Sequence, residues 1–182
     1  AYLRMRLLEH MPGLHVDTPT VPPPAMHLDA ATLTALEIRE THDGSARGSL
    51  VSMLRRTVTQ GGTRLLTQWL TQPSTSLPLI RARHMLVEFF LQRAFARQDV
   101  RARLRVSAGD VLRTLQRISM RRSDEQDLLE IRDFIRTCDE VVARLRVEVQ
   151  AAEQGGSAAL RELLARCTSL AELGEQLGGA ID

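Results

Sequence analysis

The feature that most constrains this chain is an apolar heptad repeat within residues 123–152. Apolar side chains recur there at alternating spacings of three and four residues: Leu128, Ile131, Ile135, Cys138, Val142, Leu145 and Val149. This spacing, here called the heptad seam, predicts one long helix with a single apolar stripe. At ~1.5 Å per residue the helix would be about 45 Å long, well beyond the usual ~11–12 residues. It is either an ordinary bundle helix or a rigid rod that connects two parts of a larger assembly.

The rest of the chain also predicts helices, so the expected fold class is all-α. From Ser49 onward there is hardly any of the period-two alternation that indicates strands. A short helix is expected within residues 28–38, and Pro73 and then Gly155-Gly156 indicate helix ends. Polar capping residues mark the other helix starts: Thr59, Ser76, Ser107 with Asp110, Ser123 with Gln126, Ser157, and Ser169 with Glu172.

A proline-rich segment near the N-terminus predicts a boundary in the chain. Residues 1–10 read as the end of a helix, and residues 11–25 contain Pro12, Gly13, Pro19 and the run Pro22-Pro23-Pro24. Consecutive prolines favour an extended conformation and exclude a helix interior. We therefore expect residues 1–25 to be a linker from a preceding unit and residues 26–182 to form one helical domain.

Charge is distributed unevenly along the second half of the chain. Residues 93–122 hold nine arginines against Asp99 and Asp110, whereas residues 123–153 hold nine acidic residues against four arginines. The two stretches could therefore pair as antiparallel helices. Alternatively, Arg113, Arg117 and Arg121 recur at every fourth position and could form a ridge that faces DNA phosphates. A solvated charged face is the commoner meaning of such a pattern.

Catalytic and cofactor chemistry is not indicated by any motif in the chain. All 24 basic residues are arginine, so Gly61-Gly62 cannot belong to a phosphate-binding P-loop, which requires lysine. The five histidines lack ligand spacing, and no nucleophile motif occurs. We therefore predict no catalytic, cofactor-binding or metal-binding residues. Cys138 and Cys167 form no CxxC pair, which argues against a structural disulfide. No apolar run approaches the ~20 residues of a membrane span. Trp69 lies among leucines and is predicted to be a core residue, the alternative being a platform on which a nucleic-acid base stacks.

Four segments resemble one protein family in succession. They are LDAATLTALEI (28–38), GSLVSMLRRTVTQGGTRLLTQWLTQPSTSLPLIRARHMLVEFF (48–90), DVLRTLQRI (110–118) and DEQDLLEIRDFI (124–135). In this order they are similar to the first part of the core, or lever, domain of the MutS family of DNA mismatch-repair ATPases. The likeness covers nearly the whole chain. Its last residues resemble the family segment before the DNA clamp, and residues 1–24 resemble the exit from the connector domain.

The resemblance implies a mechanical role for a chain that is not itself an enzyme. The family's phosphate loop, with its ATP and Mg²⁺, belongs to a separate C-terminal domain, and its mismatch-reading aromatic belongs to an N-terminal domain. The parent, meaning the longer polypeptide of which this chain would be one part, is expected to dimerise, to enclose DNA and to couple mismatch recognition to ATP binding. No membrane contact is expected. The partners of this chain would be the remainder of the same polypeptide and, through it, DNA.

Some residues depart from the family pattern. Ala35 stands where asparagine is common, Arg56 where aspartate is frequent, and PSTSL replaces the usual PL. RRTVT and PSTSL are similar to the fungal mitochondrial branch of the family, which implies a mitochondrial location, a nuclear one being the alternative. The competing hypothesis is an autonomous helical module that binds a protein or nucleic acid directly.

Overall fold

The computed structural model describes residues 24–106, 109–151 and 157–181, and throughout these residues the regular structure is helical. The all-α prediction is therefore confirmed. The only extended pairing among the described residues is an isolated bridge between Ala25 and Ser74. The helices are α2 (Ala30–Ala35), α3 (Leu50–Leu54), α4 (Gln60–Thr71), α5 (Leu77–Gln92), α6 (Ala94–Val106), α7 (Val111–Ser119), α8 (Glu125–Ala151), α9 (Ser157–Ala165) and α10 (Ala171–Ile181).

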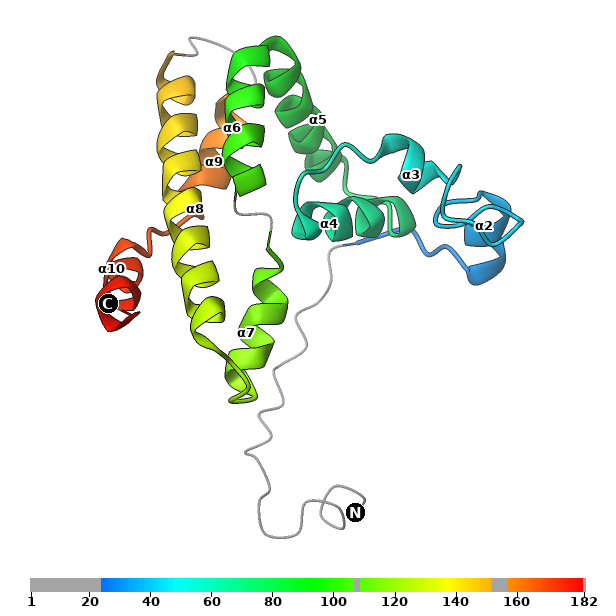
Figure 1. Ribbon diagram of the computed structural model, residues 1–182. Helices are drawn as coiled ribbons and strands as arrows, with labels where there is room; N and C mark the ends of the chain where they lie inside the picture. The colour runs from blue at the N-terminus through cyan, green and yellow to red at the C-terminus, as the bar shows by residue number, and fades with distance from the viewer. Residues whose placement is uncertain (1–23, 107–108, 152–156, 182) are drawn as a thin grey trace.

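The helices form an upright bundle with a smaller lobe at its side (Figure 1). In the bundle α6 and α7 follow one another along α8, while α9 packs between α8 and α5. Helix α10 contacts the lower part of α8, on the side away from α7. Helices α2, α3 and α4 make up the side lobe, which the chain leaves through α5.

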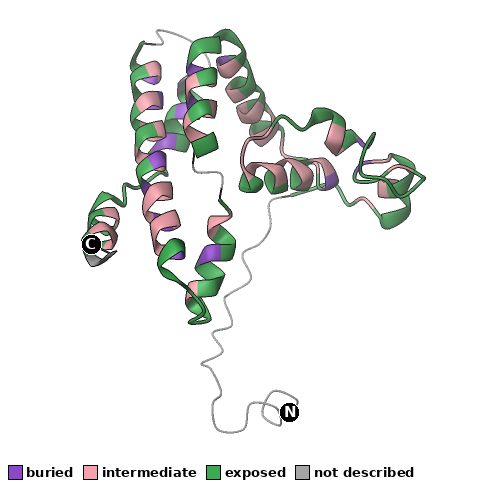
Figure 2. Cartoon of the chain, in the orientation of Figure 1, coloured by how far each residue is buried: buried purple, intermediate pink, exposed green. Residues whose placement is uncertain are grey.

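Helix α8 is the long helix that the heptad seam predicts. It runs without interruption from Glu125 to Ala151, 27 residues, or about 40 Å at ~1.5 Å per residue. Every seam residue is buried or half-buried, as the burial map shows in part (Figure 2). Four of them are less than 9% exposed: Ile131, Ile135, Leu145 and Val149. The apolar stripe is thus covered at these four positions and partly covered at the other three.

The hydrophobic core lies in the upper half of the bundle, where four helices meet. It consists of side chains from α5, α6, α8 and α9: Phe89, Val100, Leu145, Val149, Leu160 and Leu164. Phe89 and Leu160 are 1% and 0% exposed, and Phe89 meets the neighbouring Phe90 ring edge to face at 5.4 Å between centroids. Because aromatics are few, aliphatic side chains supply most of this core and of its burial free energy.

The predicted helix starts are partly correct. Thr59 caps α4, since its Oγ1 accepts the backbone N–H of Gly62 at 3.1 Å, and the helix ends at Thr71, before Pro73. Ser76 precedes α5 and Pro78 lies in the first turn, but the Ser76 side chain makes no capping hydrogen bond. Before α10, Ser169 Oγ accepts the N–H of Ala171 at 3.3 Å.

Other predicted boundaries are wrong or fall outside the described residues. Helix α8 is not capped by Ser123 and Gln126. Instead Asp124 and Asp127 each accept the other's backbone N–H, both at 3.0 Å, one residue further along. Helix α9 begins at Ser157, as expected. The expected cap at Ser107 and the helix end at Gly155-Gly156 lie outside the described residues.

The end of the predicted linker is held against the loop between α4 and α5. The N–H of Met26 donates to the carbonyl of Pro73 at 2.7 Å, and the N–H of Thr75 donates to the carbonyl of Pro24 at 3.1 Å. The remainder of the linker, residues 1–23, lies outside the described residues. The expected boundary after residue 25 therefore stays a prediction.

The two glycines at the start of α4 have different roles. A Cβ added to Gly62 would lie 3.0 Å from the capping Oγ1 of Thr59, whereas one added to Gly61 would meet nothing within 4 Å. We expect Gly61→Ala to stabilise the chain by about 0.5 kcal/mol, because alanine loses less backbone entropy on folding. Gly62→Ala should instead disturb the cap, which is worth roughly 1 kcal/mol, and so should not stabilise. Urea unfolding of both variants tests this difference, and equal effects would contradict it.

Candidate functional site

The most informative surface of the molecule is the interface of α8 with α6 and α7. Charged side chains of residues 93–117 meet opposite charges of residues 124–148 in antiparallel order. Between the helices the pairs are Arg93–Glu148 at 3.4 Å, Asp99–Arg144 at 3.1 Å, Arg103–Glu140 at 2.9 Å, Arg117–Asp127 at 3.0 Å and Arg117–Asp124 at 3.1 Å. The antiparallel pairing that the charge distribution allowed is therefore the arrangement observed.

These ion pairs specify register more than they add stability. Most of the paired side chains are between about a fifth and a half exposed, such as Arg103 at 36% and Glu140 at 48%. Pairs exposed to this extent contribute ~0–1 kcal/mol each, because solvent screens the charges. A shift of α6 along α8 would, however, separate several pairs at once. The set therefore favours one position of α8 relative to α6 and α7.

The lower end of the interface contains its most buried side chain, Asp127. The Asp127 side chain is 3% exposed, and its carboxylate is held by the guanidinium of Arg117 and the backbone N–H of Asp124. Arg117 also donates to the Asp124 carboxylate at 3.1 Å. The pKa of Asp124 is lowered, first by the hydrogen bond from the Asp127 backbone and then by the nearby Arg117 charge. Arg117 thus joins α7 to the start of α8.

One turn further along, α8 approaches the start of α7 closely. Thr114, only 4% exposed, donates its hydroxyl to Glu130 Oε2 at 2.7 Å. Glu130 also lies over Gly109, where an added Cβ would fall 1.6 Å from its Oε1. Any larger residue at Gly109 would therefore displace the Glu130 carboxylate. This close approach gives Gly109 a packing role that the sequence did not reveal.

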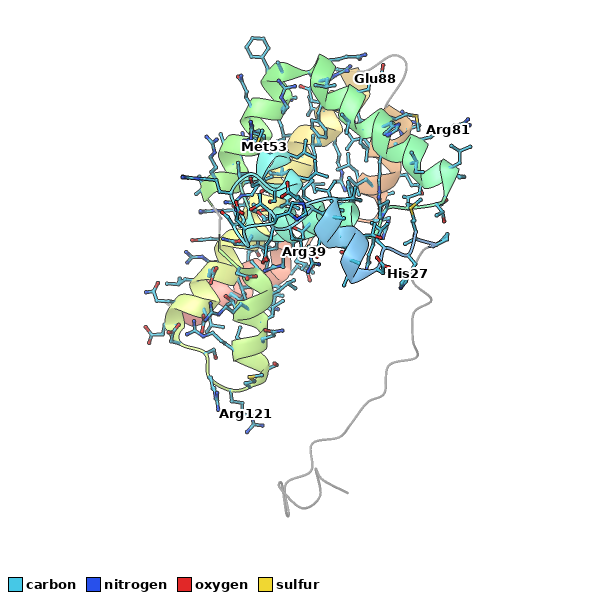
Figure 3. The ribbon with its side chains drawn as sticks, turned by 90° about the vertical axis from the view of Figure 1, so that its right-hand side faces the viewer. His27, Arg39, Met53, Arg81, Glu88 and Arg121 are labelled. Carbon is cyan, nitrogen blue, oxygen red and sulfur yellow. The ribbon has the colours of Figure 1, made fainter. Side chains whose placement is uncertain are left out.

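The predicted arginine ridge is divided between two environments. Arg113, Arg117 and Arg121 are all exposed on or just after α7, but Arg117 is engaged by the carboxylates of α8. Arg121 has a positive φ of 54° in the turn before α8 and projects from the tip of the bundle (Figure 3). The DNA-facing role of these residues stays a prediction.

A second set of contacts ties the side lobe to the bundle. Arg64 of α4 donates both guanidinium nitrogens to the Asp110 carboxylate at the start of α7, at 2.7 and 2.8 Å. This contact is the first cause of a raised pKa for Arg64 and a lowered pKa for Asp110. Arg101 of α6 also donates to the backbone carbonyl of Arg56, before α4. The start of α4 is thus attached to both α6 and α7.

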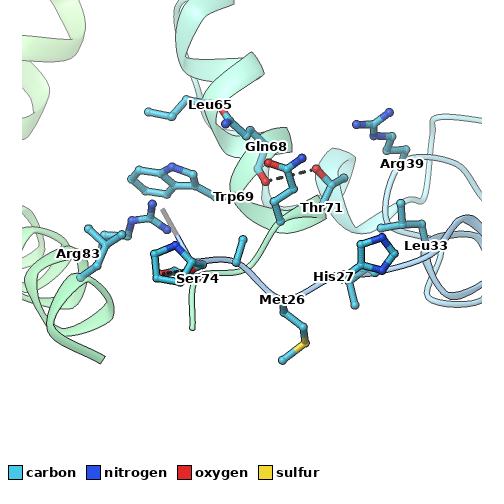
Figure 4. A pocket seen from close by; sticks show the side chains of 15 residues that line it. Met26, His27, Leu33, Arg39, Leu65, Gln68, Trp69, Thr71, Ser74 and Arg83 are labelled. Atoms are coloured by element: carbon cyan, nitrogen blue, oxygen red, sulfur yellow. Dashed lines mark hydrogen bonds between the residues drawn. The ribbon is translucent and has the colours of Figure 1, made fainter. Parts of the chain in front are cut away.

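The prediction that Trp69 is a core residue is wrong. Its side chain is 38% exposed, and the guanidinium of Arg83, from α5, lies 3.8 Å from the ring centroid (Figure 4). The ring borders an open hollow of about 730 Å³ between α4, α5 and the segment around Met26 and His27. The sequence placed Trp69 among leucines, but the ring lies at the surface with the Arg83 guanidinium over one face, in a cation–π contact.

No arrangement typical of a metal site or membrane span occurs in the described parts of the chain. Over residues 24–106, 109–151 and 157–181, histidine, cysteine and acidic side chains form no group of three with metal-binding geometry. Within the same residues, every helix is too short or too polar to cross a bilayer.

A family model and individual relatives point to the same protein family. The family model described as MutS domain III matches residues 31–181. The DNA mismatch repair protein MutS of Roseiflexus castenholzii is 39% identical over 126 residues, which are 68% of this chain and 12% of that protein. MutS of Nitrobacter winogradskyi is 36% identical over 156 residues, 86% of this chain and 17% of that protein. The chain thus spans less than a fifth of these relatives, and the similarity to a mitochondrial branch stays a prediction.

Proposed function

This chain belongs to the MutS family, whose domain III it matches, and we propose that it is the core of a DNA mismatch repair protein in which α8 acts as a lever. On this proposal α8 transmits movement between a DNA clamp and an ATPase domain of the same polypeptide. ATP and Mg²⁺ would be bound by that separate domain, and the parent would dimerise around DNA. The chain itself would hydrolyse nothing.

The continuity of α8 is the observation that carries the proposal. One uninterrupted helix of 27 residues is contacted by α6, α7, α9 and α10. A helix moves as one body only while its hydrogen bonds are intact. Because the ion pairs and the seam favour one register, movement at one end of α8 would be carried to the helices packed on the other.

Exposed apolar side chains support the expectation that the rest of the polypeptide covers this domain. Val87, Leu91 and Phe95, around the turn between α5 and α6, are 58%, 68% and 87% exposed. On α3, Met53 and Leu54 are 66% and 51% exposed. Grouped apolar exposure of this kind marks contact surfaces in soluble proteins. The relatives are much longer than this chain, and on this proposal the additional parts of such a polypeptide cover these exposed side chains.

The lever role is tested by loosening α8 without removing a contact. Ala143 is exposed in the middle of α8, so Ala143→Gly should cost about 1 kcal/mol of helix propensity and little packing. Glu140 would be a poorer choice, because its carboxylate is bonded to Arg103. In the full-length protein we expect slower ATP-triggered release from an open-ended mismatch duplex, measured by stopped flow. Mismatch affinity and basal ATP hydrolysis should stay near normal.

The matched control is the same substitution on a neighbouring helix. Ala102 is exposed on α6, so Ala102→Gly loosens α6 by a similar amount and leaves α8 unchanged. Hydrogen exchange would verify which helix has been loosened in each variant. The lever proposal predicts slower release for Ala143→Gly alone. Equal release rates in both variants and the unmodified protein, with loosening of α8 verified, would refute it.

A further inference from the structure

An apolar groove between α8 and the end of α9 contains both cysteines of the chain. The groove has a volume of about 770 Å³ and is lined mainly by leucine, valine and alanine side chains. Cys138 reaches it from the seam of α8, where it is half-buried, and Cys167 from just after α9, where it is exposed. Both are free thiols in the structure. Two thiols from separate elements therefore border one cavity.

The chain before Cys167 brings it toward the middle of α8. Helix α9 returns along α8, and its residue Leu164 packs in the core cluster with Leu145. Cys167 follows Leu164 by three residues, and its Sγ lies 3.5 Å from the carbonyl oxygen of Leu163. Cys167 thus lies below the level of Leu145, beside the residues of α8 that line the same groove.

The chain after Cys167 sets the other limit. A Cβ added to Gly174 of α10 would lie 3.4 Å from Cγ2 of Ile135, so α10 passes α8 at that level. Cys167 precedes Gly174 in a segment that travels along α8 from the level of Leu145 to that of Ile135. Cys138 lies between these two levels and faces the same groove.

The two thiols differ in their expected reactivity. Cys167 is exposed and so is open to a reagent in solution. Burial raises the pKa of the Cys138 thiol, and the nearby Asp139 and Cys167 raise it further. Cys138 is therefore a poor first nucleophile, and its place on the same groove as Cys167 suits it to the second step.

We propose that Cys138 and Cys167 form a reversible dithiol site that a small-molecule disulfide of the glutathione class oxidises to a disulfide within the chain. The Cys167 thiolate attacks one sulfur of the reagent, so the reagent's S–S bond breaks and one thiolate leaves. Cys138 then gives up its proton and attacks Cys167 Sγ, which expels the second thiolate. Both cysteines are oxidised, the reagent is reduced to two thiols, and the two cysteine protons are taken up by the departing thiolates.

The bond would fasten the connection between α9 and α10 to the middle of α8. It would close the groove and limit any movement of α10 along α8. The inference does not rest on the lever proposal, because it concerns only the proximity and reactivity of two thiols.

The test is oxidation of the folded chain in a defined mixture of oxidised and reduced glutathione. We expect an intramolecular disulfide, detected as a monomer that has lost two hydrogen atoms and resists alkylation at both cysteines. The effective concentration of one thiol relative to the other should be about tenfold or more higher in the folded chain than in the urea-unfolded chain, because folding holds the two thiols together. Cys138→Ser should stop the reaction at a glutathione adduct on Cys167.

A displaced cysteine supplies the control for proximity. Val147 is exposed on α8, nine residues beyond Cys138, which is about two and a half turns at ~3.6 residues per turn and therefore the opposite face of the helix. In the Cys138→Ser background, Val147→Cys should react as an independent thiol and form no bridge to Cys167. Glutathione adducts or disulfide-linked dimers as the only products of the unmodified chain would overturn the proposal. So would equal effective concentrations in the folded and unfolded chains.

Discussion

Replacing Ile135 with proline is expected to lower the free energy of unfolding by at least about 4 kcal/mol. Proline removes a backbone donor from the interior of α8 and its ring clashes with the preceding turn, at a cost of ~3 kcal/mol or more. The substitution also removes a side chain that is 6% exposed and contacts α10 next to Gly174. A loss of this size approaches the whole stability of an ordinary domain, ~5–15 kcal/mol. Urea unfolding followed by circular dichroism measures it.

Ile135→Val separates the backbone effect from the packing effect. Valine keeps the helix donor and most of the buried volume, so it should cost only ~0.5–1.5 kcal/mol. We therefore expect the valine variant to unfold cooperatively at a slightly lower urea concentration, and the proline variant to lose most of its helical signal in the absence of urea. A proline variant about as stable as the valine variant would show that α8 does not need to be continuous.

The long helix was predictable because its signal is repeated. Each seam residue contributes the same spacing, so an error at one position leaves the pattern intact. The start of the helix has no such redundancy. Ser123 with Gln126 and Asp124 with Asp127 both have capping-box spacing, and serine and aspartate cap helices almost equally well. Arg117 favours the second pair, because its guanidinium binds both Asp124 and Asp127.

The charged interface was predictable only as one of two alternatives. The excess of arginine in residues 93–122 is compatible with antiparallel pairing and with a basic surface. What decides is the direction of individual side chains, and local spacing does not specify that. Arg113 and Arg117 lie four residues apart on α7, yet only Arg117 reaches the buried Asp127. The DNA-facing ridge and the structural pairing therefore looked alike in sequence.

Trp69 and Gly109 show a second limit of sequence reasoning. The cation over Trp69 is Arg83, which arrives from the next helix after the turn at Pro73. The crowding at Gly109 comes from Glu130, which arrives from α8. Neither partner follows from local periodicity, since each contact depends on how two helices cross. Such contacts become visible only once the helices are placed in space.

Replacing Arg117 with alanine is the other change from which we expect a large effect, about 2 kcal/mol of lost stability. The loss would leave the Asp127 carboxylate, 3% exposed, with the Asp124 backbone N–H as its only remaining partner among the described residues. An unpaired buried charge is costly, although the partial exposure of Arg117, at 46%, reduces the penalty below the ~3–5 kcal/mol of a fully buried pair. Urea unfolding at neutral pH measures the difference.

Arg113→Ala is the matched control, because Arg113 is exposed on the same helix and has no ion pair within 24–106, 109–151 and 157–181. Its removal should change stability by less than ~0.5 kcal/mol.

The pH dependence of unfolding supplies a second check. The lowered pKa of Asp124 makes its ionised form stabilising above pH ~4, and that contribution is lost as pH falls through the lowered value. The deficit of Arg117→Ala should therefore shrink as pH falls from ~4 through the lowered pKa, because Asp124 becomes protonated and no longer attracts Arg117. Two results would show that Arg117 does not hold α7 to α8 through these carboxylates. One is an equal loss of stability in Arg113→Ala and Arg117→Ala. The other is a deficit of Arg117→Ala that stays the same as the pH is lowered.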